Sequence, residues 1–250
     1  MNPTYARLDA RRVLRNPGVL TFVIVLPAAM YVIFGAIQSY SDADAGHGNV
    51  AAVVMASMAS YGAISAATSL AASTALEQAH GWGRQLSLTP LVGARYVATK
   101  VATIMLVTLA PVVVVLAVGA GTGARIDGIR WLWTLLLCWV SCVPFALLGL
   151  ALALLVRNEA AMSIGSFAIL IFAFLGNMFV PLGGFMLKLA RFTPLYGVNV
   201  IARYPISGNM EATAGPAVPV SMWWPVGNFV AWTIIFAGLA VIASRRRQER

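Results

Sequence analysis

The amino-acid sequence predicts an all-α polytopic membrane protein with six transmembrane helices. Composition is the first observation behind this prediction: 60% of the 250 residues are hydrophobic and only 10% are charged, whereas soluble domains carry about 25% charged residues. The second observation is a set of six stretches without Asp, Glu, Lys or Arg, at 16–41, 45–76, 101–124, 131–156, 160–187 and 225–244. A helix needs about 20 apolar residues to cross a bilayer, so each stretch can hold one span.

The chain begins with a basic segment, 1–16, in which Asn2-Pro3 favours the start of a helix. Its apolar residues form no clean stripe, so we expect a weakly amphipathic helix at the membrane surface. The first span covers about 18–37. This run is longer than the apolar core of about 7–15 residues in a signal peptide, so we expect the chain to retain it. A polar turn, 38–49, follows.

The second span, about 50–75, is rich in small residues. They recur every four positions, as in the series Ala52, Ala56, Ser60 and the series Ala59, Ala63, Ala67, Ala71. Small residues let helices approach closely within a membrane. Ordinary packing explains most of these positions; the functional alternative is a loosely packed face along a substrate path or a moving interface.

Residues 77–100 form the longest polar interruption that also carries helix signals. Gly81 and Gly83 break the helix that continues from the second span, and a short helix over 84–88 is ended by Pro90. Its mixture of apolar and polar side chains suits a helix that sits in the groove of a partner protein. We expect this coupling helix to occupy 77–90, with 91–100 leading into the third span.

Three further spans follow, at about 101–119, 131–155 and 160–180, joined by turns at 119–130 and 157–159. Segment 181–224 is half apolar, sparsely charged and broken by Pro and Gly. It is too broken for a span and too apolar for a free loop, so we expect re-entrant or outer helices that fold back at the membrane edge. The sixth span, about 225–243, precedes four terminal arginines.

Lys and Arg predict the orientation, because loops on the cytoplasmic side of a membrane carry an excess of them. With the N-terminus inside, twelve of the 17 basic residues lie on the inner side and five on the outer side. We therefore expect a multi-pass protein of the plasma or inner membrane with both termini in the cytoplasm. The net charge of +9 is explained by this flanking pattern, and we expect no nucleic-acid partner.

The sequence lacks the residues needed for ATP binding, metal binding, triad catalysis or ion-coupled transport. The only lysines are Lys100 and Lys188, and neither lies in a phosphate-binding G-x-x-x-x-G-K-[ST] motif. His47 and His80 stand alone on opposite sides of the membrane, so neither a metal site nor a catalytic triad is predicted. The spans contain no ionisable acid or base, which argues against an ion-coupled carrier and suits a hydrophobic or amphiphilic cargo.

Two soft motifs and the six-span layout carry a resemblance to a known family. The first motif comprises Glu77, Gly81, Arg84, Gln85, Leu86, Leu88, Thr89-Pro90 and Lys100, in that order. The second comprises Pro181, a short helix over 185–192 and Thr193-Pro194-Leu195-Tyr196. On these residues the whole chain resembles the permease subunits of ABC-2 type transporters. Arg84 departs from that family, where an acidic residue is common, and so does Gly184-Phe185, where a Met-Pro pair is common.

The resemblance implies one permease domain over 1–250 that is not itself an enzyme. It implies a partner ATPase subunit in two copies, which binds ATP and Mg, while the permease binds no cofactor. It also implies a second permease chain, with a homodimer expected and a related chain as the alternative. The cargo would be a drug, antibiotic, peptide or lipid that is exported from the cell, and membrane lipid would surround the complex.

The same resemblance assigns roles to residues of this chain. Coupling to the ATPase would fall to Glu77, His80, Gly81, Trp82, Arg84, Gln85, Leu86, Leu88 and Pro90. The cargo path, lined by spans one, two and five, would include Tyr61, Ser65, Ser69, Ser166, Phe167, Phe174 and Asn177. The outer gate would include Pro181, Phe185, Pro194 and Tyr196.

Two alternatives belong to other functional classes. One is a membrane scaffold or sensor that transports nothing, which the neighbouring reading frame would test, because an ATP-binding cassette gene beside this one favours the transporter. The other is a membrane-embedded enzyme acting on lipid. Its best residues would be Glu211, His47, Asp42 and Asp44, all on the outer side, and loop chemistry explains them equally well.

Overall fold

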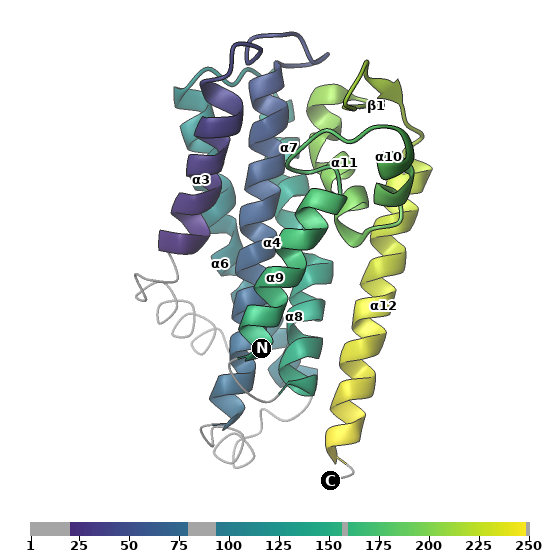
Figure 1. Ribbon diagram of the computed structural model, residues 1–250. Coiled ribbons are helices and arrows are strands. Elements are labelled where there is room, and N and C mark those ends of the chain that lie inside the picture. The colour runs from purple at the N-terminus through teal and green to yellow at the C-terminus, as the bar shows by residue number, and fades with distance from the viewer. Residues whose placement is uncertain (1–20, 80–93, 157–159, 249–250) are drawn as a thin grey trace.

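A computed structural model shows a bundle of helices packed around one central helix, and it describes residues 21–79, 94–156 and 160–248. The surface helix predicted over 1–16 and most of the coupling helix lie outside the described residues. The chain runs up and down, so that the connections fall at two opposite ends of the bundle (Figure 1). The end that carries loops 38–49 and 119–130 is called the loop end below.

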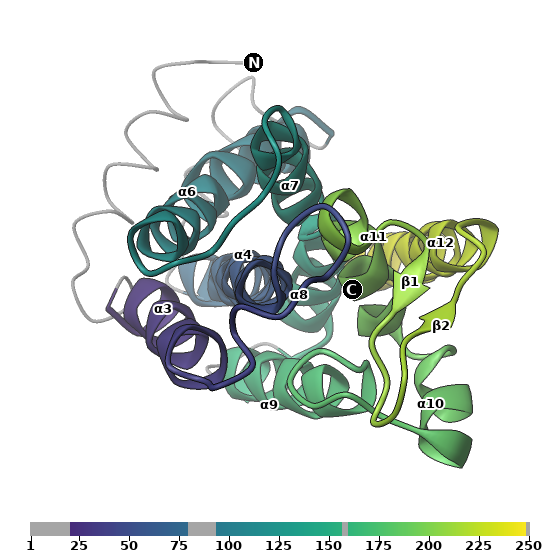
Figure 2. The ribbon, with the colours of Figure 1, turned by 90° about the horizontal axis from the view of Figure 1, so that it is seen from above.

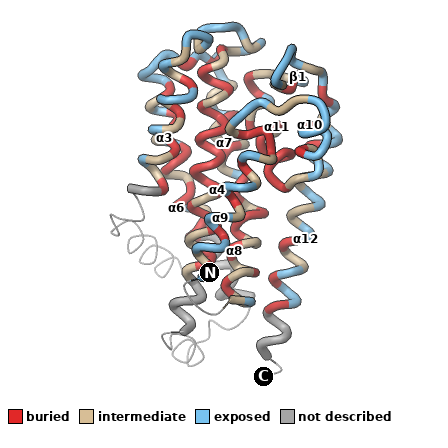
Figure 3. The backbone as a smooth tube through the Cα atoms, viewed as in Figure 1, coloured by how far each residue is buried: buried red, intermediate tan, exposed pale blue. Residues whose placement is uncertain are grey.

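The central helix is α4, Val50–Ala79. Seen from above, α3, α6, α7, α8 and α9 surround it (Figure 2). In its most apolar window 83% of the positions are buried, as the red colour of α4 shows (Figure 3). Ala59, Ala63, Ala67 and Ala71 are almost completely buried, so these small residues serve close packing, the more ordinary of the two interpretations.

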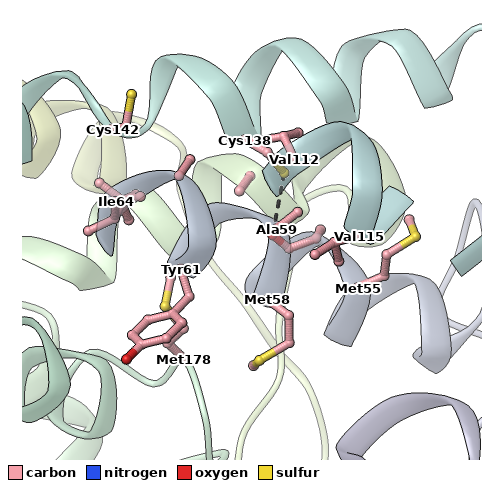
Figure 4. Close-up of a cluster of buried hydrophobic side chains, with 14 of the residues drawn as sticks. Met55, Met58, Ala59, Tyr61, Ile64, Val112, Val115, Cys138, Cys142 and Met178 are labelled. Carbon is pink, nitrogen blue, oxygen red and sulfur yellow. Dashed lines mark hydrogen bonds between the residues drawn. The ribbon is translucent and has the colours of Figure 1, made fainter. Parts of the chain in front are cut away.

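Larger side chains from α4 and its neighbours fill the core between the small residues. Met55, Met58 and Ile64 of α4 are fully buried and pack with Val112 and Val115 (Figure 4). Cys138 and Cys142 are free thiols that are completely buried in the same core.

The helix at the place of the first predicted span is irregular. An α-helical turn, α3 (Leu26–Tyr31), lies between two π-helical turns, η1 (Thr21–Val25) and η2 (Val32–Ala36). Pro27 stands in the first turn of α3, where its missing N–H is tolerated best. The buried ring of Tyr31 packs against Gly35, since a Cβ there would lie 2.9 Å from the ring.

The third and fourth predicted spans, 101–119 and 131–155, form three helices. α6 covers Ala94–Gly121 in one piece. The predicted span 131–155 is divided into α7 (Arg130–Val140) and α8 (Val143–Leu155). Pro144 in the first turn of α8 explains the break, because proline cannot donate the backbone hydrogen bond that would continue α7.

The fifth predicted span, 160–180, is shorter than expected. α9 covers Ala160–Leu175 and is followed by Asn177, whose φ is 59°. A left-handed residue ends a helix, and asparagine adopts this conformation more readily than most residues. The helix therefore stops before Asn177 and does not continue to residue 180 as predicted.

The segment between the fifth and sixth predicted spans folds back beside the bundle, as expected for 181–224. It contains α10 (Gly184–Ala190), α11 (Pro194–Ser207) and a two-stranded antiparallel ribbon of β1 (Met210–Glu211) and β2 (Val218–Pro219). Both helices lie at the level of the loop end, next to the first half of α12 (Trp223–Gln248) (Figure 1). α12 lies at the edge of the molecule, with 17% of its apolar window buried.

Four helical stretches are long and apolar enough to cross a membrane: Val50–Ser73, Thr103–Gly121, Arg130–Leu155 and Trp223–Ala243. Two shorter apolar helical stretches, Val23–Ala36 and Ala160–Leu175, occupy the places of the first and fifth predicted spans. The all-α membrane architecture is thus present in the described residues, and six complete spans remain a prediction.

Hydrogen bonds join the loops at the loop end. Gly48 pairs with Ile126 in a β-bridge, and the backbone N–H of His47 donates to the carbonyl of Ile206 on α11. Asn49 precedes α4 and caps it, because its side-chain oxygen accepts from the N–H of Ala52. The same side chain also binds the carbonyl of Gly123, so one residue connects the two loops.

Candidate functional site

The predicted cargo-path residues fall into two groups. Tyr61, Ser65 and Ser69 follow one stripe of α4 at a spacing of four residues, with Tyr61 buried and the two serines half-buried. On α9, Ser166, Phe167 and Phe174 are exposed. No described side-chain contact connects Ser166 or Phe167 to the α4 stripe.

Aromatic contacts do connect Tyr61 with Phe174. Both rings meet Phe179, which follows α9: Tyr61 at a centroid distance of 4.8 Å and Phe174 at 5.1 Å. The interplanar angles of 67° and 87° are edge-to-face arrangements, the geometry that aromatic pairs favour. These three residues, called the aromatic trio below, form an aromatic cluster between α4 and α9, in which Phe174 is 50% exposed.

Asn177 lies beside the trio but its side chain is engaged in structural bonds. Its side-chain oxygen accepts from the N–H of Leu182 at 2.7 Å, and its amide donates to the carbonyl of Ala212 at 2.9 Å. Its own carbonyl accepts from the amide of Asn199 on α11 at 2.7 Å. Asn177 therefore holds the end of α9 to the folded-back segment.

A half-buried arginine occupies the junction of α4, α11 and the end of α9. The Nε of Arg203 donates to the hydroxyl of Ser57 on α4 at 2.6 Å, and Nη2 donates to the carbonyl of Met178 at 3.2 Å. Burial lowers the pKa of Arg203 to about 10, although the charge of Glu211 acts in the opposite direction. The guanidinium group is therefore positively charged at neutral pH.

Glu211 is the buried acid of this region, with 1% of its side chain exposed. Its Oε2 pairs with Nη2 of Arg191 at 3.3 Å and accepts from the hydroxyl of Tyr196 at 3.0 Å. Asn177 approaches Oε1 at 3.4 Å. Burial, and then the charge of Glu211, raise the pKa of Tyr196, so its hydroxyl stays protonated and donates to the carboxylate.

The predicted gate residues separate into exposed and buried pairs. Pro181 is exposed and Phe185 has 76% of its surface exposed on α10. Pro194 and Tyr196 are buried at the start of α11. Tyr196 belongs to a small second core with Leu187, Ala190, Val200 and Val220, so the folded-back segment has a packed interior of its own.

Side chains of α12 fix the turn between α10 and α11. Trp224 and Asn228 donate to the carbonyl of Arg191, at 3.2 and 3.0 Å, and Trp232 donates to the carbonyl of Phe192 at 3.0 Å. The donors are spaced by four residues and so share one face of the helix. Gly197 allows α11 to approach α12, since a Cβ there would lie 2.6 Å from the carbonyl of Pro225.

Most of the predicted coupling residues cannot be placed. Glu77 lies in the last turn of α4, at the end of the bundle opposite the loop end (Figure 1). His80, Gly81, Trp82, Arg84, Gln85, Leu86, Leu88 and Pro90 lie outside the described residues. Their role in coupling stays a prediction.

The acids and the histidine considered for an enzyme do not form one site. Asp42 pairs with Arg125 at 2.7 Å, His47 lies 3.9 Å from Asp127, and Glu211 is enclosed by the partners named above. No group of three or more His, Cys, Asp or Glu residues that could hold a metal ion is present in the part of the chain that the structure describes.

Four residues of the site were missed by sequence reasoning: Phe179, Asn199, Arg203 and the partner hydroxyl of Ser57. The available signal was a charged and an amide residue within the otherwise apolar stretch 194–207. Such residues in apolar helices usually point to function. The sequence analysis considered only the spans and so left out Asn199 and Arg203, because 194–207 was not predicted to be a span.

Comparison with known proteins gives a family for the chain. No curated protein matches the sequence. A family model described as ABC-2 type transporter matches residues 5–210. That range contains α4, the aromatic trio and the helices α10 and α11, and it covers most of the 250 residues. The chain therefore belongs to the ABC-2 type transporter family, as a membrane permease component of an ABC transporter.

Proposed function

We propose that the chain is the permease subunit of an ABC exporter that moves a hydrophobic or amphiphilic cargo out of the cell. The observation that carries this proposal is the family match over 5–210, which spans both the predicted coupling segment and the aromatic trio. A separate ATPase, present in two copies and holding ATP and Mg, would dock on residues 77–90. The permease itself would contribute no catalytic group.

The positions of Glu77 and of the aromatic trio along the central helix support coupling of the docked ATPase to the cargo path. Glu77 lies in the last turn of the central helix, whereas Tyr61 of the aromatic trio and Ser57, which binds Arg203, lie in its first half. Because α4 contacts the helices around it along its length, a shift at its 77 end would be transmitted to the packed residues near Tyr61. The loop end would face outside, in line with the Lys and Arg distribution.

A second permease chain would complete the path. α3 and α9 lie on the same side of α4 (Figure 2). The turn η2 that continues α3 exposes Phe34, and α9 exposes Phe167 and Phe174. A homodimer facing across this side would enclose the half-exposed ring of Phe174. Such a face suits cargo with a large apolar part.

The coupling role of Glu77 can be tested by replacing it with alanine. We expect Glu77→Ala to lower ATP-driven export at least about tenfold, because losing a hydrogen bond to a charged group costs about 1.5–3 kcal/mol. Asp127→Asn is the matched control, since Asp127 is an exposed acid at the loop end. ATP-driven uptake of cargo into inverted membrane vesicles, which corresponds to export from the cell, and chain abundance in the membrane are both measured. Unchanged export by Glu77→Ala would remove this residue from the coupling element.

A further inference from the structure

Three charged side chains are gathered where the folded-back segment meets the bundle, and their charges do not cancel. Arg191 and Glu211 form an ion pair at 3.3 Å. The remaining capacity of the Glu211 carboxylate is taken by Tyr196 at 3.0 Å and Asn177 at 3.4 Å. Arg203 is the third group, so the region holds two cations and one anion.

Arg203 has only uncharged partners. Its two hydrogen bonds go to the hydroxyl of Ser57 and the carbonyl of Met178. Among the residues that the structure describes, none forms an ion pair with it. A guanidinium group has five N–H donors in a planar fork that matches a carboxylate or a phosphate. A guanidinium charge that no carboxylate contacts directly is costly in a poorly hydrated place, and binding an oxyanion would offset that cost.

Aromatic side chains lie next to the polar partners of Arg203. Ser57 lies one helical turn before Tyr61 on α4, and Met178 directly precedes Phe179. The guanidinium group is therefore adjacent to the aromatic trio, on the side nearer the loop end. Beyond the trio, α9 presents the exposed apolar side chains of Phe167 and Leu170.

We propose that Arg203 is an anion-binding subsite for an amphiphilic cargo whose head carries a carboxylate or phosphate and whose apolar part lies on the aromatic trio. The inference rests on the proposed function, because it treats the trio as part of the cargo path. It narrows the expected cargo from hydrophobic or amphiphilic molecules in general to amphiphilic molecules with an anionic head group. Ser57 and Met178 position the guanidinium group toward this head group.

The test uses the purified full-length chain in nanodiscs of phosphatidylcholine, without any ATPase, and radiolabelled oleate as the probe. Unlabelled oleate, oleyl alcohol and acetate compete with it. We expect oleate to compete at least about tenfold better than oleyl alcohol, because hydrogen bonds to charged groups are the stronger ones. Acetate at the same concentration should not compete. Equal competition by the alcohol, or full competition by acetate, would overturn the proposal.

Variants separate an anion subsite from a structural contact. Arg203→Gln should remove the preference for oleate over oleyl alcohol, whereas Arg203→Lys should retain part of it. Ser57→Ala removes a hydrogen bond that positions the guanidinium group but removes no charge, so it should weaken the preference less than Arg203→Gln does. Arg125→Gln is the control, because Arg125 is an exposed arginine paired with Asp42 at the loop end. A preference that persists in Arg203→Gln contradicts the subsite.

A second measurement needs no variant that might fail to fold. A photoreactive oleate analogue should label peptides within 174–179 or 199–207 of the wild-type chain, and labelling confined to other segments overturns the proposal. Failure can also be assigned. If the ATPase co-purifies but oleate shows no preference, only the subsite is wrong. If Arg203-dependent binding is found but no ATPase associates, the transport function is wrong and the binding site stands.

Discussion

Glu211 shows how individual polar residues organise an otherwise apolar molecule. Its carboxylate accepts from Arg191, Tyr196 and Asn177, which come from three separate elements. Buried polar groups are costly unless they are hydrogen-bonded. The three donors therefore stabilise the folded-back segment only while α10, α11 and the end of α9 stay together.

The hydroxyl of Tyr196 gives a test of this connection. We expect Tyr196→Phe to lower the thermal unfolding midpoint in neutral detergent by an amount that corresponds to about 1–3 kcal/mol, the cost of a lost buried hydrogen bond. Tyr204→Phe is the control on the same helix, because Tyr204 is 41% exposed, and it should change stability by less than about 0.5 kcal/mol. Equal shifts in the two variants would show that Tyr196 contributes through its ring alone.

The polar residues also show the limit of reading residues from the sequence. The spans were predicted to lack charged residues. The four described helical stretches contain no Asp, Glu, Lys or Arg, with the exception of Arg130, the first residue of one of them. Arg203 and Glu211 belong to no span, yet folding back brings Arg203 against Ser57 on α4. That contact joins residues 146 positions apart, and no local pattern specifies it.

At the scale of elements, small residues determine how closely the helices approach α4. A Cβ on Gly149 of α8 would lie 2.8 Å from the Cβ of Ala71. Next to this contact, the hydroxyl of Thr68 donates to the carbonyl of Phe145 at 3.2 Å. The backbones of α4 and α8 are thus in close contact, which side chains larger than glycine would prevent.

Glycine substitutions test the closeness of this contact. Gly149→Ala should destabilise the chain by about 1–3 kcal/mol, because added volume in a packed interface forces the helices apart. Gly238→Ala is the matched control in α12, where a Cβ would meet nothing within 4 Å; it should be neutral or slightly stabilising, since alanine favours helix by up to about 1 kcal/mol over glycine. Thermal unfolding midpoints in the same detergent give the comparison, and a neutral Gly149→Ala would contradict the close approach.

Hydropathy predicted which stretches are helical but not where helices break. The second and sixth predicted spans, 50–75 and 225–243, match the described stretches Val50–Ser73 and Trp223–Ala243 closely. The break before Pro144 and the end of α9 at Asn177 were not predicted. Both breaks keep apolar side chains on each side, so a hydropathy window cannot detect them. The backbone conformation of Asn177 depends on its bonds to Leu182 and Ala212, which exist only in the fold.

At the scale of the whole molecule, the two ends differ in charge. The predicted outer side has five basic and four acidic residues, whereas the predicted inner side has twelve basic and four acidic ones. Two of the five basic residues on the predicted outer side are paired with acids, Arg125 with Asp42 and Arg191 with Glu211. This asymmetry is the one expected for a loop end that faces away from the cytoplasm.

The two ends also differ in construction. At the loop end, Gly48–Ile126 pairing and the bond from His47 to Ile206 hold the connections together. α12 fixes the turn between α10 and α11 through Trp224, Asn228 and Trp232. The central helix connects this braced end with Glu77 at the other, which suits a permease that receives energy at one end and releases cargo at the other.

The central claim, that this chain is a permease driven by a separate ATPase, is tested most directly by ATP hydrolysis. The chain is purified from its native membranes under mild conditions, and hydrolysis is measured before and after bound proteins are removed. We expect an ATP-binding cassette protein to co-purify, the complex to hydrolyse ATP and the stripped chain to show no activity. Robust hydrolysis by the stripped chain, or a native preparation without an ATP-binding cassette protein, would contradict the account.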